Sequence, residues 1–155
     1  MNNEPKTDPP SIIRVDHLVR PVYPDSVKKV VHPELENLGP TEFDANKLEL
    51  WVQDGQKGNK AIQGHKIYEH LKENKMLEGC LGLRDLEEIQ KKGIDFFRRF
   101  FRGKVVFAWK SVVLYHRYNE LYVPCLAEAI GMVLSDWVCL DSYWDSNGPA
   151  LRLAS

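Results

Sequence analysis

The sequence predicts an α+β fold, in which a mostly antiparallel sheet of about four to five strands carries two or three short helices packed on one face. Three runs rich in β-branched and aromatic residues, 104–115, 121–127 and 132–140, are separated by breaks too short for crossover connections. Between residues 64 and 102, apolar residues recur with helical spacing. A chain of 155 residues has the size of one domain, which we expect to cover residues 12–155.

The first 46 residues offer little regular pattern. Residues 1–11 combine proline, asparagine and charged residues with nothing to bury, so we expect a mobile N-terminal tail. Residues 12–46 hold short apolar groups interrupted by four prolines, which is typical of an irregular arm on the surface. From Lys47 to Val52 apolar and polar residues alternate, which indicates a strand with one buried face.

Three helices are expected in the middle of the chain. The first begins near residue 64 and places Ile67 and Leu71 on one side. The second covers residues 83–92, where apolar residues form one stripe and charged pairs form the other. The third covers residues 94–102, where the phenylalanines have the spacing of core residues and the arginines are left for solvent or a partner.

The sheet is expected after these helices. The run 104–115 is apolar at both sets of alternate positions, which indicates a central strand covered on both faces. Pro124 cannot donate a hydrogen bond, so the run 121–127 is expected at an edge of the sheet or at a bulge. Residues 150–154 alternate after the turn signal Asn147–Pro149 and predict a short final strand.

Composition indicates a soluble cytoplasmic protein. The three cysteines show no CxxC spacing, so we expect free thiols in a reducing compartment. The N-terminal sequence lacks the apolar stretch of a signal peptide. No window approaches the roughly 18 to 20 apolar residues that span a membrane, so no membrane partner is expected.

Metal and nucleotide motifs are not found. His65 and His70 are five positions apart, about 140° around a helix, whereas zinc-protease motifs place two histidines on one helical face. The glycine-containing loop 54–66 lacks the spacing of a phosphate-binding P-loop. The sequence therefore predicts neither a metal site nor a cofactor.

Two sets of side chains leave a small hydrolase open as an alternative function. Asp136, Asp141 and Asp145 lie among aromatic residues, and paired carboxylates act as general acid and base when they share one cleft. Cys125 and His116 would form a nucleophile and a base if the strands brought them together. A small thiol in an apolar run is more often a buried structural residue.

Charge is unevenly distributed along the chain, although the formal net charge is only -1. Residues 91–117 hold eight Lys and Arg residues against one Asp, while acids outnumber bases on both sides of this segment. Because the phenylalanines of the third helix are expected in the core, its basic side chains remain for recognition. The predicted binding residues are Arg98, Arg99, Arg102 and Lys104, with Trp144 as an exposed aromatic residue.

These features favour a small non-enzymatic binding or adaptor domain that recognises an acidic protein surface through the basic helix end. Nucleic-acid binding is a third hypothesis, because arginines bind phosphates and exposed aromatic rings stack on bases. Domains dedicated to nucleic acid usually have a high overall pI, whereas the net charge of this chain is slightly negative. A protein partner is therefore the leading prediction.

Overall fold

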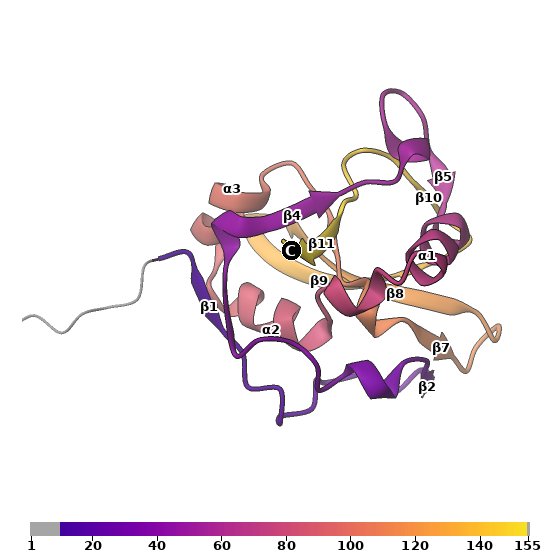
Figure 1. Ribbon diagram of the computed structural model, residues 1–155, viewed down its shortest axis with the longest axis horizontal. Helices are drawn as coiled ribbons and strands as arrows, with labels where there is room; N and C mark the ends of the chain where they lie inside the picture. The colour runs from indigo at the N-terminus through magenta and orange to yellow at the C-terminus, as the bar shows by residue number, and fades with distance from the viewer. Residues whose placement is uncertain (1–9, 155) are drawn as a thin grey trace, which may run out of the picture.

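The structure is a computed structural model that describes residues 10–154 (Figure 1). Its largest sheet has seven strands, namely β2 (Val27–Val30), β4 (Leu48–Trp51), β6 (Val106–Phe107), β7 (Val113–Tyr115), β8 (Leu121–Ala129), β9 (Met132–Cys139) and β11 (Ala150–Leu153). Their order is β2-β7-β8-β6-β11-β4, and β9 lies on the other side of β8. Two smaller sheets pair β1 (Ile12–Arg14) with β3 (Glu42–Asp44), and β5 (Ile62–Gln63) with β10 (Tyr143–Trp144).

The large sheet is mixed, which corrects the prediction of a mostly antiparallel sheet with four to five strands. β11 pairs with β4 in the antiparallel direction and with β6 in the parallel direction, where Ala150 lies opposite Phe107. These pairings join segments that are far apart in the sequence, and no local turn signal encodes them. The α+β class itself is confirmed, because the sheet is combined with three α-helices.

The helices are those that the apolar spacing predicts. They are α1 (Gly64–Glu73), α2 (Leu83–Lys91) and α3 (Ile94–Phe101). Among the described residues, no helix combines the length and the apolar character needed to cross a membrane. Short 3-10 turns occur at η1 (Pro33–Leu35), η2 (Ala45–Lys47), η3 (Asp54–Gln56), η4 (Leu77–Gly79) and η5 (Trp109–Ser111).

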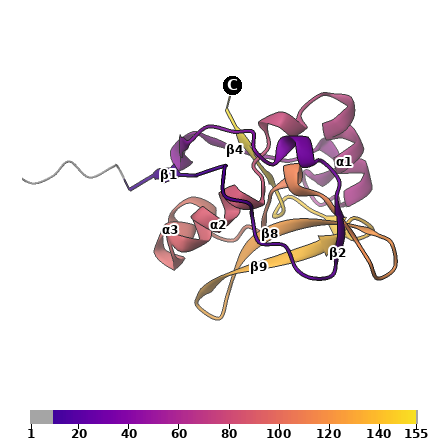
Figure 2. The same cartoon turned by 90° about the horizontal axis from the view of Figure 1, so that it is seen from below.

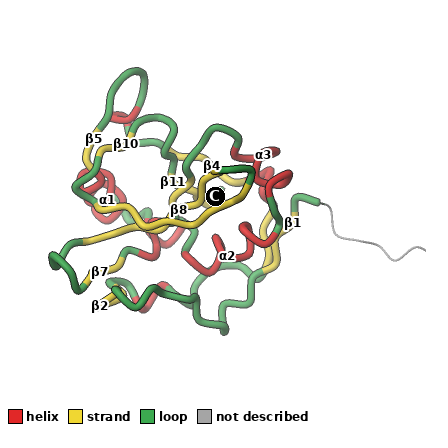
Figure 3. The backbone as a smooth tube through the Cα atoms, turned by 180° about the vertical axis from the view of Figure 1, so that it is seen from behind, coloured by secondary structure: helices red, strands yellow, loops and turns green. Residues whose placement is uncertain are grey.

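The two faces of β8 belong to two different hydrophobic cores. Cys125 lies in one core with Ile67 and Leu71 of α1. Leu126, the next residue, faces the opposite side of the sheet and packs with residues of α2 and α3. The prediction that all helices lie on one face is therefore wrong, and Figure 3 shows β8 passing between α1 and α2.

The run 104–115 is not one central strand, because η5 divides it into β6 and β7. Lys110 in this turn is buried, and its Nζ donates a hydrogen bond of 2.9 Å to the carbonyl of Leu38. Ser111 is also buried, and its Oγ accepts a hydrogen bond of 2.7 Å from the backbone N–H of Leu83. A regular strand would not deliver these polar groups to their partners, and burying them unpaired is costly.

β8 is a central strand, in contrast to the edge position expected from Pro124. The carbonyl of Pro124 accepts a hydrogen bond from the backbone N–H of Ala108, so this residue faces the place where β6 ends and η5 begins. The strand ladder is interrupted there, and no N–H is required from the proline. β8 therefore pairs with β9 along one side and with β6 and β7 along the other.

The arm at residues 12–46 is more regular than its prolines suggest. It contains β1, β2 and β3, and β2 joins the large sheet beside β7. The prolines lie between these strands and not within them, so they do not remove ladder hydrogen bonds. The predicted tail, residues 1–11, falls mostly outside the described residues, but Ser11 is buried and its carbonyl accepts a hydrogen bond from the N–H of Ala45.

Candidate functional site

The basic end of α3 is exposed because its aromatic residues face the core. Phe97 and Phe101 are fully buried. Arg98 is already paired within the chain, since its Nε and Nη2 both donate to the carboxylate of Glu128, with an Nε–Oε2 distance of 2.9 Å. This hydrogen-bonded pair raises the pKa of Arg98 and lowers the pKa of Glu128. A carboxylate of the chain itself therefore already binds Arg98.

The neighbouring basic residues remain more open. The guanidinium of Arg99 lies 5.0 Å from the ring centroid of Phe100, and Arg102 is exposed at the end of the helix. Within the described part of the chain, neither arginine forms an ion pair. Lys104 is half-buried, and its Nζ donates a hydrogen bond of 3.3 Å to the side chain of Asn147. Arg99 and Arg102 are therefore the strongest candidates for contact with an acidic partner.

Trp144 is buried, which corrects its prediction as an exposed recognition residue. Only 3% of its surface is accessible, and its ring centroid lies 5.1 Å from that of Phe107. Two glycines make room for the indole, since a Cβ at Gly64 would lie 2.5 Å from the ring and a Cβ at Gly148 would lie 2.8 Å from it. Trp144 therefore belongs to the core, and the sequence gives no local sign of this fit.

The carboxylates of the hydrolase alternative are each engaged in a separate local contact. None of these contacts joins two of the three residues, so the described contacts do not assemble a general acid and base pair. Asp136 accepts from the N–H of Trp137 at 2.8 Å, Asp141 lies 2.7 Å from Nε2 of His65, and Asp145 accepts from the N–H of Asn147 at 2.8 Å.

Cys125 and His116 are also not brought together as a nucleophile and a base. His116 lies before β8, and its backbone N–H donates to the carbonyl of Ser26. Cys125 lies four residues beyond the start of β8, which corresponds to about 13 Å along a strand. Burial raises the pKa of the Cys125 thiol to about 12, with a further contribution from Asp136. A protonated, buried thiol is a poor nucleophile at neutral pH.

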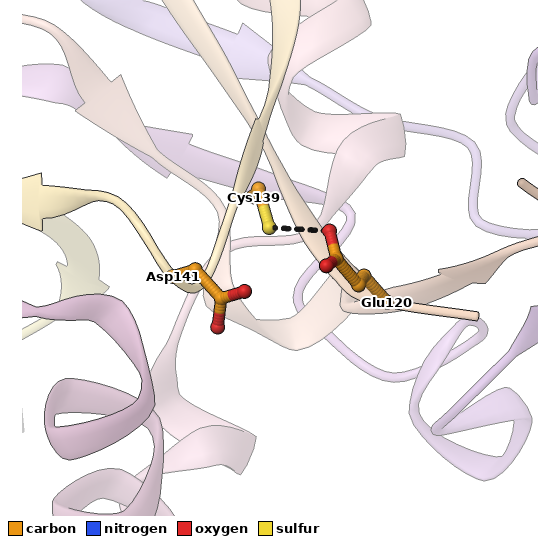
Figure 4. A group of neighbouring side chains, drawn as sticks. All are labelled: Glu120, Cys139 and Asp141. Atoms are coloured by element: carbon orange, nitrogen blue, oxygen red, sulfur yellow. Dashed lines mark hydrogen bonds between the residues drawn. The ribbon is translucent and has the colours of Figure 1, made fainter. Parts of the chain in front are cut away.

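Three side chains of kinds that can bind a metal ion lie close together where β8 begins and β9 ends (Figure 4). Donor atoms of Glu120, Cys139 and Asp141 all lie within 4.8 Å of one another. Sulfur and oxygen donors of this kind suit zinc. The thiol of Cys139 donates to Glu120 at 3.2 Å, and burial raises the pKa of this thiol, so the two groups satisfy each other without an ion. The sequence did not reveal this group, because only the strand register brings its members together.

A buried polar group, here called the Asp85 cluster, anchors the arm to the N-terminus of α2. It consists of His17, Gly82, Asp85, Lys110 and Ser111. Asp85 accepts a hydrogen bond of 2.8 Å from the N–H of Gly82 and lies 3.2 Å from Nε2 of His17. Burial raises the pKa of Asp85 and lowers the pKa of Lys110. The adjoining cavity of about 10 Å³ holds at most one water molecule, which leaves no room for a substrate.

A groove of about 360 Å³ lies between the arm, α2 and the strands β8 and β9. Its apolar lining includes Val22 from the arm, Leu83 and Leu86 from α2, and Leu126 and Trp137 from the two strands. One wall is held in place by a hydrogen bond of 2.9 Å from the N–H of Val22 to the carboxylate of Glu87. The groove is therefore a recess beside the last strand of the sheet.

β9 is the outer strand at this side of the sheet, with the β8–β9 hairpin projecting past α3 (Figure 2). Its residues Leu134, Ser135 and Asp136 are exposed. The groove and the basic end of α3 thus lie close to one exposed strand edge. Comparisons of the chain with models of protein families, with curated proteins and with solved structures gave no match.

Proposed function

We propose that the domain is a non-enzymatic protein-binding module that recognises an acidic partner surface through the basic end of α3. The observation that carries this proposal is the exposure of Arg99 and Arg102, which lack ion pairs among the described residues. Exposed charges of one sign attract a complementary surface and increase the rate of encounter. Arg98 contributes less than the sequence suggests, because Glu128 already binds it.

A protein partner is favoured over nucleic acid by the packing of the aromatic residues. Base stacking requires exposed aromatic rings. Phe97 and Phe101 are fully buried, and the half-buried rings of Phe96 and Phe100 pack against each other with centroids 4.7 Å apart. Two of the four rings are therefore closed to base stacking, and the other two are partly covered by each other.

The test compares two anionic probes of about 20 units each, a fluorescent polyglutamate and a single-stranded DNA, by fluorescence anisotropy at low salt. We expect the wild-type protein to bind polyglutamate and the Arg99→Glu/Arg102→Glu variant to bind it about 10-fold more weakly or worse. The wild-type affinity should fall as salt is added, because the contact is between exposed charges.

The matched control is Lys60→Glu/Lys66→Glu, which changes the net charge by the same amount at exposed positions in the loop before β5 and on α1. Its affinity should stay within about twofold of wild type if the α3 surface is the specific site. Equal weakening by both variants would show a general charge effect and contradict the proposal. Tighter binding of the DNA, with the same dependence on Arg99 and Arg102, would favour the nucleic-acid hypothesis instead.

A further inference from the structure

We infer that the partner contributes an extended acidic segment, which adds to the large sheet as a new strand along β9 and places side chains in the adjoining groove. This inference rests on the proposed function and specifies the form of the partner. Strand addition is a common way in which a sheet edge binds a peptide, because the backbone supplies affinity and alternate side chains supply specificity.

The strand register identifies the backbone groups of β9 that face away from β8. Ala129 lies opposite Met132 across a two-residue turn, and Cys125 lies opposite Asp136. Residues that flank such a turn form a hydrogen-bonded pair, so the even-numbered residues of β9 direct their N–H and C=O groups to β8. The odd-numbered residues, including Val133 and Ser135, direct theirs outward.

Two side-chain contacts agree with this assignment. The carbonyl of Val133 accepts a hydrogen bond of 3.0 Å from the amide of Gln90, and the N–H of Trp137 donates to the carboxylate of Asp136. These contacts occupy part of the edge. The outward N–H and C=O of Ser135, between them, have no partner among the described residues, and the residue is exposed. An added strand would pair with Ser135 first.

The groove lies on the side of the sheet to which the partner residue opposite Ser135 would point. Residues that face each other in a sheet direct their side chains to the same face. Ser135 and Trp137 both line the groove, and its lining also includes Leu83 and Leu86. An apolar side chain opposite Ser135 would therefore enter an apolar recess. On the other face, the next partner residue would cover Leu134, which is 39% exposed.

Charge determines the expected composition of the segment. Val133 lies opposite Glu128, whose carboxylate binds Arg98, so the hairpin end of β9 is next to the basic end of α3. A strand on β9 that extends past Val133 would reach this basic region. Acidic residues at that end of the segment would complement it, whereas basic residues would be repelled.

The experiment is a selection from a displayed library of random peptides of about 12 residues, long enough to cover a strand and its flanks. Peptides are selected on the wild-type protein and rejected if they bind the Ser135→Pro variant. Proline at position 135 removes an outward N–H and no hydrogen bond to β8, so we expect the variant to keep the fold, which its far-UV circular dichroism checks. Ser135→Ala is the matched control, since it removes the hydroxyl and keeps the N–H.

The expected result is enrichment of acidic peptides with alternating apolar residues. In direct titration they should bind the wild-type and Ser135→Ala proteins within about twofold of each other, and the Ser135→Pro protein about 10-fold more weakly. Failure to enrich any peptide that distinguishes Ser135→Pro from wild type would overturn the inference. If binding is lost in Arg99→Glu/Arg102→Glu but unchanged in Ser135→Pro, the proposed function stands and strand addition is wrong.

Sedimentation of the wild-type protein alone tests whether the β9 edge pairs with a second copy of the chain instead of a peptide. A dimer that Ser135→Pro dissociates would show that β9 pairs with a second copy of this chain, and it would overturn the assignment of the edge to an acidic segment. A monomer in both forms, together with peptide binding, is the outcome that we expect. Amide exchange at Ser135 should slow when the selected peptide binds, because its N–H then enters a ladder.

Discussion

The Asp85 cluster and the Arg98–Glu128 pair contain the same kinds of charged groups in opposite surroundings. Asp85 and Lys110 are each only 4% exposed, and most of their polar contacts come from the backbone and from the arm. The side chains of Arg98 and Glu128 are 36% and 30% exposed, and they contact mainly each other. Burial therefore makes the first group structural, while exposure leaves the second free to exchange partners.

This difference separates stability from recognition in the molecule. A buried charge that loses its partner keeps its full desolvation cost, whereas an exposed charge is resolvated by water. Changes in the Asp85 cluster should therefore alter the free energy of unfolding. Changes in the Arg98–Glu128 pair should chiefly alter which anionic groups the surface attracts.

The largest effect is expected from Asp85→Ala. This substitution leaves the N–H of Gly82 and the buried Nε2 of His17 without their carboxylate, and it removes the negative charge near the buried ammonium of Lys110. We expect a loss of about 3 to 5 kcal/mol in the free energy of unfolding. Urea denaturation measures this loss. The control is Asp95→Ala in the exposed first turn of α3, where the same deletion should cost no more than about 1 kcal/mol. Equal losses would contradict the comparison.

The pH dependence of stability should have opposite signs in the two regions. Burial raises the pKa of Asp85 above its usual 3.8, so the native state binds this proton more tightly than the unfolded state. The part of Asp85's contribution that depends on its protonation is therefore fully present below pH 3.8 and falls as pH rises through the native pKa, while its hydrogen bond from Gly82 remains. Arg98 lowers the pKa of Glu128 below 4.5, so the contribution of Glu128 is present above pH 4.5 and is lost as pH falls.

Unfolding titrations across this acidic range can separate the two contributions. The free energy of unfolding of wild type minus that of Asp85→Asn should decrease as pH rises. The free energy of unfolding of wild type minus that of Glu128→Gln should increase as pH rises. Two slopes of the same sign would contradict the difference between the two surroundings.

The smallest effect on stability is expected from Glu128→Gln at neutral pH. The side chain keeps its size and loses its charge, and exposed ion pairs contribute little. Any difference in the free energy of unfolding between this variant and wild type should disappear at about 0.5 M salt, where exposed charges are screened. Because Arg98 is then released, polyglutamate should bind this variant more tightly than wild type in the anisotropy assay. Weaker binding would show that Glu128 positions Arg98 for recognition.

The sequence predicts local elements well where apolar spacing controls them. The three helices are found because residues such as Ile67, Leu71 and Phe97 recur with helical spacing and are buried on one side. The strands β8 and β9 are found because the Ile130–Gly131 turn joins two long runs. These features depend on neighbours in the sequence, which is the information that a single sequence contains.

The errors come from contacts between distant segments. The mixed sheet depends on β11 lying beside β6, and the burial of Trp144 depends on the space above Gly64 and Gly148. The pairing of Arg98 depends on Glu128, 30 residues away. None of these leaves a local pattern. The sequence did not predict the exposed edge at Ser135 for the same reason. Whether a strand lies at an edge depends on how the other strands pair, and the residues of the strand itself do not show this.

The position of β11 between β4 and β6 has a consequence for how the chain folds. Among residues 10–154, β4 joins the sheet through β11 alone, and Trp51 lies opposite Ala150, so about 100 residues separate the two partners. Closing a loop of that size costs conformational entropy before its contacts provide any stabilisation. The β8–β9 hairpin, by contrast, closes over two residues. Such long-range pairing slows folding, so β4 is expected to dock late, after the hairpin and the helices have formed.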